Sequence, residues 1–100
     1  MGDRIGLIFR DSMGDDNGII IHSHWMGREL LKLAQRFYKE CSDETKEACC
    51  DTVTARFMLW LGITQCKHVD DLDIDIQPHD DDCEDNGVWV MDMGTGLIGE

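Results

Sequence analysis

The sequence is poor in positive charge, and this shortage limits the partners that the protein can bind. Of its 100 residues, 9 are Lys or Arg and 21 are Asp or Glu, so the formal net charge is −12 at pH 7. Nucleic acids are dense lines of negative charge, which opposes nonspecific binding of DNA or RNA. We therefore expect no nucleic-acid partner. The same charge favours cations or a basic protein partner.

Long apolar runs are also missing. No uncharged stretch approaches the roughly 20 residues that a membrane-spanning helix needs, and no cationic start leads into an apolar segment. We expect a soluble protein with neither a signal peptide nor a membrane partner. The hydrophobic fraction of 42% is enough for one compact core, and the length predicts one domain over residues 1–100.

Regularly spaced cysteine motifs are absent. The five cysteines form an odd set with two adjacent members and no CxxC pair, namely Cys41, Cys49, Cys50, Cys66 and Cys83. A secreted disulfide scaffold more often has an even count. The pattern favours reduced thiols in a cytoplasmic protein. It also lacks the spacing of the common zinc and thioredoxin motifs.

Two similar turn motifs are present, one toward each end of the chain. Asp16-Asn17-Gly18 and Asp85-Asn86-Gly87 each lie between apolar segments. Asn-Gly is typical of tight hairpin turns, because both residues tolerate a positive φ. These motifs predict two β-hairpins, over residues 4–23 and 71–92.

Helical periodicity occupies the middle of the chain. Apolar residues recur at helical spacing in two segments, which predicts helices over residues 28–41 and 43–61, the second ending at Gly62. The expected fold is α+β with the order ββααββ, in which a four-stranded antiparallel sheet carries both helices on one face. The glycine-rich tail, 94–100, matches GxGxxG without the following helix of a dinucleotide site. We expect this tail to be flexible or to pair with a neighbouring chain.

The strand patterns also bear on partners. Three of the four expected strands are apolar on both faces, whereas the two helices can cover only one face of the sheet. This excess predicts a homodimer or a larger homo-oligomer. In the remaining strand, Asp71, Asp73 and Asp75 alternate with aliphatic residues, and we expect this acidic row to face water and protect a sheet edge.

His22-Ser23-His24 is the sharpest candidate for a chemical site. Alternation along a strand places both imidazoles on one face, about 7 Å apart at their Cα atoms. Cys66 and His68 could complete a zinc site, and Asp11 or Asp92 in their place would give a hydrolytic site with an open water position. Histidines with no ligand role are the competing interpretation.

Two further features are weaker candidates. Arg28, at the start of the first expected helix, could hold an anion, although a glycine turn with a solvated arginine is the favoured account. Asp80, Asp81 and Asp82 could bind a cation weakly, although a solvated acidic loop is the simpler account.

The sequence supports two functions, and it favours the first over the second. One is a small acidic module that acts through self-association or partner binding. The other is zinc binding, structural or hydrolytic, centred on His22 and His24. No catalytic residue is assigned, and the sequence contains no nucleophile motif such as GxSxG.

Overall fold

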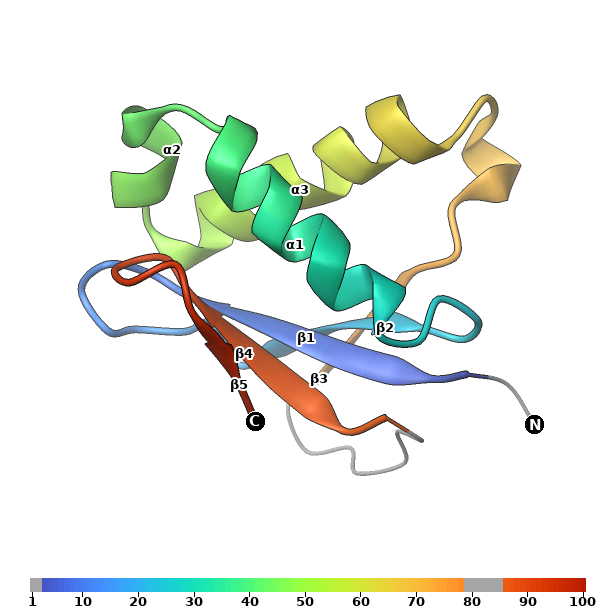
Figure 1. Ribbon diagram of the computed structural model, residues 1–100, viewed down its shortest axis with the longest axis horizontal. Coiled ribbons are helices and arrows are strands. Elements are labelled where there is room, and N and C mark those ends of the chain that lie inside the picture. The colour runs from blue at the N-terminus through green and yellow to red at the C-terminus, as the bar shows by residue number, and fades with distance from the viewer. Residues whose placement is uncertain (1–2, 79–85) are drawn as a thin grey trace.

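The computed structural model describes residues 3–78 and 86–100, and within them the fold is α+β. A five-stranded sheet carries three α-helices and a short 3₁₀ helix, all on one of its faces (Figure 1). The elements in chain order are β1 (Ile5–Arg10), β2 (Ile19–Ser23), α1 (Glu29–Glu40), α2 (Asp43–Glu47), α3 (Cys50–Gln65), η1 (Val69–Asp71), β3 (Asp75–Pro78), β4 (Val88–Asp92) and β5 (Ile98–Gly99).

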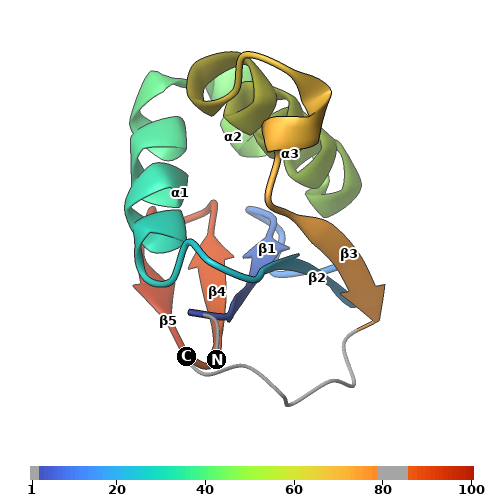
Figure 2. The same cartoon turned by 90° about the vertical axis from the view of Figure 1, so that its right-hand side faces the viewer.

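The sheet is mixed, so the predicted four-stranded antiparallel sheet and the ββααββ order are wrong in detail. Its strand order is β3-β2-β1-β4-β5, with β3 and β5 at the two edges (Figure 2). β1 lies at the centre and pairs antiparallel with β2 but parallel with β4. The parallel pair was not foreseen because turn motifs report only on strands adjacent in sequence.

The first pair of strands exists, but its connection is not a two-residue turn. β1 ends at Arg10 and β2 begins at Ile19, and no described residue other than glycine has a positive φ. Asn17 therefore does not form the type I′ turn that was predicted. Instead its side-chain oxygen accepts a hydrogen bond from the Ile19 N–H at 3.2 Å, while Gly18 adopts a φ of +67°.

The second predicted hairpin does not form. β3 pairs antiparallel with β2, and β4 pairs with β1. Asn86 starts β4 beside the N-terminal end of β1, because its backbone N–H donates to the Arg4 carbonyl at 2.9 Å. The Gly6 N–H then donates to the Gly87 carbonyl at 3.1 Å. These bonds set the two strands side by side in the same direction.

The glycine-rich tail is part of the sheet rather than a free end or an extension to another chain. Its β5 pairs with β4, and the turn between them is closed by the Gly96 N–H, which donates to the Asp92 carbonyl at 2.7 Å. Gly96 has a φ of +77°, and a Cβ there would lie 2.8 Å from the Tyr38 ring. Glycine is thus required at this position by both backbone and packing.

The helices follow the predicted periodicity, except that the second segment is divided. α1 buries Leu30, Leu33, Ala34 and Phe37. Where one helix over 43–61 was expected, α2 ends at Glu47 and α3 begins at Cys50, because Ala48 and Cys49 are extended. α3 also continues past Gly62, where an added Cβ would meet nothing within 4 Å.

A buried carboxylate accounts for the start of α3. The Asp11 side chain, in a residue only 5% exposed, accepts hydrogen bonds from the backbone N–H groups of Met13 and Asp15 at 3.0 Å and of Cys50 at 3.1 Å. It therefore caps α3 from a distant loop. The bond from the Asp15 N–H, supported by those from Cys50 and Met13, holds the Asp11 pKa below its ordinary value of 3.8.

The main core lies between the sheet and the helices. Phe9 of β1 packs against Phe57 of α3 and Phe37 of α1, with ring centroids 4.9 and 6.1 Å apart. On the opposite face of the sheet, Ile8 and Ile20 are 1% and 0% exposed within one chain. The burial of these two residues therefore does not require a second copy of the chain, and the homodimer stays a prediction. No helix in the described part of the chain is long and apolar enough to cross a membrane.

The Asp11 contacts lead to a test by pH. The lowered pKa means that the folded state favours the charged carboxylate, so its stabilisation is present above the ordinary value of 3.8 and is lost as pH falls through the folded pKa. Asp11→Asn should therefore lower the Tm by several degrees at neutral pH. The difference from the wild type should shrink as the pH falls below 3.8. Thermal melts followed by circular dichroism at a series of pH values measure both effects.

Asp15→Asn is the matched control, because it removes the same charge from the exposed side chain of a nearby loop residue. It should change the Tm little at any pH. Equal losses in the two variants would show that loop charge, rather than the Asp11 hydrogen bonds, sets the stability.

Candidate metal centre

His22 lies in β2, and His24 follows the last residue of that strand. Their ring centroids are 4.6 Å apart and the rings meet edge to face. His22 stands between Gly6 of β1 and Asp75 of β3 in the strand register. The residue is 4% exposed, whereas 54% of the His24 side chain is exposed. The pair therefore has one buried and one solvent-facing imidazole.

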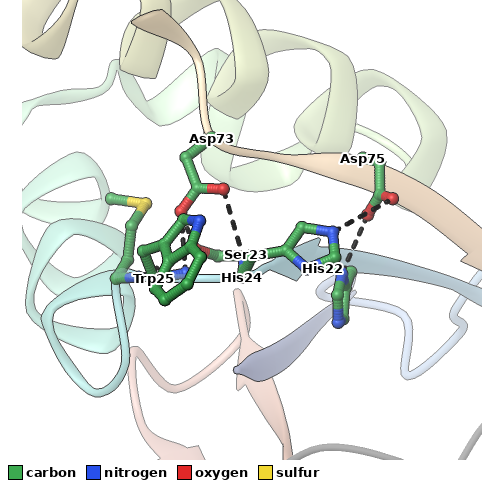
Figure 3. A network of polar contacts seen from close by, with 7 residues as sticks. His22, Ser23, His24, Trp25, Asp73 and Asp75 are labelled. Atoms are coloured by element: carbon green, nitrogen blue, oxygen red, sulfur yellow. Dashed lines mark hydrogen bonds and ion pairs between the residues drawn. The ribbon is translucent and has the colours of Figure 1, made fainter. Parts of the chain in front are cut away.

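Asp75 places a carboxylate between these rings (Figure 3). Its Oδ1 lies 2.9 Å from His22 Nδ1, and its Oδ2 lies 3.9 Å from His24 Nε2. Each of the three residues offers one ligand atom, and these atoms all lie within 4.8 Å of one another. Half of the Asp75 side chain is exposed, which leaves the cluster open to solvent on one side.

Two imidazoles and one carboxylate form a recognised donor set for metal ions. Catalytic zinc sites use three protein ligands of this kind and keep a further position for water, and non-haem iron sites use two histidines and one carboxylate. Without a metal, the carboxylate simply orients the buried imidazole through a hydrogen bond. The geometry is thus compatible with both a metal site and a His–Asp pair.

Ser23 takes no part in this cluster, although it lies between the histidines in sequence. Its Oγ donates to Asp73 Oδ2 at 2.8 Å, and the same oxygen accepts from the Trp25 N–H at 2.9 Å (Figure 3). Asp73 Oδ1 accepts from the His24 N–H at 3.4 Å. Asp73 therefore holds the turn between β2 and α1, and Ser23 is not a nucleophile activated by His22.

The structure does not bring Cys66 and His68 into the cluster. Cys66 follows the last turn of α3, and His68 caps η1 by accepting a hydrogen bond from the Asp70 N–H at 3.2 Å. Because α3 runs beyond Gly62, the segment that follows it is carried to the helical side of the molecule (Figure 2). Among the described residues, the group that could hold a metal consists of His22, His24 and Asp75.

The alternative carboxylates lie at the other end of β1. Asp92 pairs with Arg10, whereas His22 pairs with Gly6. Asp92 Oδ1 accepts from the Gly94 N–H at 2.8 Å, and Asp11 is engaged by the start of α3. Neither can meet the histidines.

Two other predicted sites have different outcomes. The Arg28 guanidinium lies over the Trp89 ring, 5.1 Å from its centroid, which is a cation–π contact. Anion binding by Arg28 stays a prediction. Asp80, Asp81 and Asp82 lie outside the described residues.

Asp75 is the member of the cluster that sequence reasoning missed. The sequence correctly predicted Asp75 to lie in a strand, but it paired that strand with residues 88–92 instead of with β2. The usable signal was its position in an alternating acidic segment, which brings carboxylates to one face of an edge strand. Comparison with protein-family models, curated proteins and solved structures gives no match.

The Asp73 contacts predict a loss of stability when the carboxylate is altered. Asp73→Asn replaces one carboxylate oxygen, which accepts hydrogen bonds, with an amide NH2 group. This group would face the donors that the oxygen had bound. We expect the free energy of unfolding to fall by about 1–3 kcal/mol, as measured by urea denaturation. Asp70→Asn is the control, because the Asp70 side chain is 86% exposed. If the two variants are equally stable, Asp73 does not hold the turn.

Proposed function

We propose that this protein binds a divalent transition-metal ion, with zinc as the first candidate, through His22, His24 and Asp75. The observation that carries the proposal is the convergence of three ligand atoms to within 4.8 Å from β2, the residue just after it, and β3. Nitrogen and oxygen donors suit zinc and its neighbours in the first transition series. The net charge of −12 further favours an approaching cation.

The position of the ligands suggests what the ion does. β3 is a four-residue strand at the edge of the sheet, and its contacts with β2 extend from the Ile19–Pro78 pair to the His22–Asp75 pair. An ion held by His22, His24 and Asp75 would join the two strands at the His22–Asp75 end. The same three ligands leave a coordination position for water, the arrangement of hydrolytic zinc sites. Binding is thus the proposed function, and hydrolysis is a chemistry that the bound ion would permit.

Native mass spectrometry and calorimetric titration with zinc test the proposal. The wild type should bind one ion per chain, and His24→Gln and Asp75→Asn should each weaken binding by at least about tenfold. Both altered side chains are about half exposed, so the fold should survive. His22→Gln is less informative because His22 is buried.

His68→Gln and Cys66→Ser are the controls. Both residues are zinc ligands predicted from the sequence, but in the structure they lie apart from the His22, His24 and Asp75 cluster. Each variant should therefore leave zinc affinity unchanged. Loss of zinc in these variants, or its retention in both His24→Gln and Asp75→Asn, would contradict the assignment.

Zinc should also stabilise the fold through β3. At about 100 times its Kd, a ligand that binds only the folded state adds about 2.7 kcal/mol to the free energy of unfolding. Hydrogen–deuterium exchange should slow in peptides that cover 75–78, and this slowing should be absent in Asp75→Asn. Slower exchange confined to other segments would show that zinc binds elsewhere.

A further inference from the structure

An apolar groove runs along the outer side of α3, away from the histidines. Its volume is about 510 Å³, and it lies between the last turns of α3 and the segment that contains η1. Its apolar lining includes Met58, Leu59, Ile63, Val69 and Leu72. The groove is thus built from one helix and the chain that folds back beside it.

The side chains of this groove are unusually exposed for their type. Leu59 is 64% exposed, Ile63 72% and Val69 81%. The core side of α3 is formed by Val53 and Phe57, so Leu59 and Ile63 form a second apolar face on the same helix, with Val69 of η1 beside them. A helix that is apolar on several sides is normally covered on those sides, and a contiguous exposed apolar surface marks an interaction site.

Charge identifies the kind of occupant. Asp70 and Asp71 follow Val69 directly, and a smaller hollow of about 220 Å³ continues past Cys66 and Leu72 to Asp71 and Asp73. Lys67 is the charged residue that lines the groove itself. The exposed residues Asp70 and Asp71 adjoin the groove beyond Val69, so the surroundings of this end carry more negative than positive charge. A second copy of this chain would bring another net charge of −12 to the same surface, which disfavours self-association there.

We propose that the groove binds an amphipathic helix of another protein, whose apolar face carries basic residues at its edge. A helix laid along α3 would bury its apolar residues against Leu59, Ile63 and Val69. Its basic residues would lie near Asp70 and Asp71. This site is independent of the metal centre, because it uses none of His22, His24 and Asp75.

A synthetic helical peptide, LKKLLKLLKKLLKL, is the probe. We expect it to bind the full chain in fluorescence anisotropy and to lose about tenfold or more in affinity for the double variant Leu59→Ser/Ile63→Ser. Met13→Ser is the matched control, because Met13 is 84% exposed but lies in the loop between β1 and β2. It should bind the peptide as the wild type does.

Three results would overturn the proposal. Equal binding of SKKSSKSSKKSSKS, which has the same charge without the apolar face, would show that charge alone attracts the peptide. Equal affinity of the double variant and the wild type would place the peptide elsewhere. A dimer in sedimentation velocity that the double variant abolishes would assign the groove to a second copy. Circular dichroism confirms that each variant is folded before it is scored.

Discussion

The parallel pairing of β1 with β4 is the contact on which the rest of the architecture depends. It places β1 at the centre of the sheet, with β2 on its other side and α1 and α3 above it. Successive side chains of β1 point to opposite faces of the sheet, one of which the helices cover. Leu7 and Ile8, on opposite faces, are both almost fully buried. Both faces of β1 are thus shielded from water at these two positions within one chain.

The sequence was informative where a structure depends on local spacing. The apolar residues from Leu30 to Phe37 indicated α1, and those from Val53 to Phe57 indicated the core face of α3. The break between α2 and α3 was not predictable in this way. It depends on Asp11, which lies 39 positions away in sequence from Cys50, the residue whose N–H it caps. A cap supplied from a distant loop leaves no periodic signal near the helix that it starts.

The candidate site likewise has one part that local spacing predicts and one part that depends on residues distant in sequence. His22 and His24 are two positions apart where β2 ends, so their proximity could be predicted without knowledge of the fold. Their third partner depends on which strand lies beside β2, and local patterns do not report strand order. The Asn-Gly motif near residue 86 favoured pairing of β3 with β4, whereas Asn86 instead fixes β4 against the segment before β1. The wrong strand partner is therefore the reason that Asp75 was not among the predicted ligands.

The acidic row shows how one sequence pattern can have several physical causes. Asp71 accepts hydrogen bonds from the Lys67 and His68 N–H groups at the start of η1, at 3.2 and 3.1 Å. Asp73 holds the turn after β2, and Asp75 lies between the two histidines. Only Asp75 belongs to a strand.

The alternation of aspartate with aliphatic residues therefore does not describe a solvated strand face. The intervening Leu72 and Ile74 pack against the core, while each carboxylate meets a different set of donors. This division also explains why the stretch from Leu72 to Asp75 contributes to both candidate surfaces. Leu72 lines the groove beside α3, and Asp75, three positions later, belongs to the metal cluster. Packing of the aliphatic residues fixes where the carboxylates can lie, so the geometry of the cluster depends on how this stretch is held against the core.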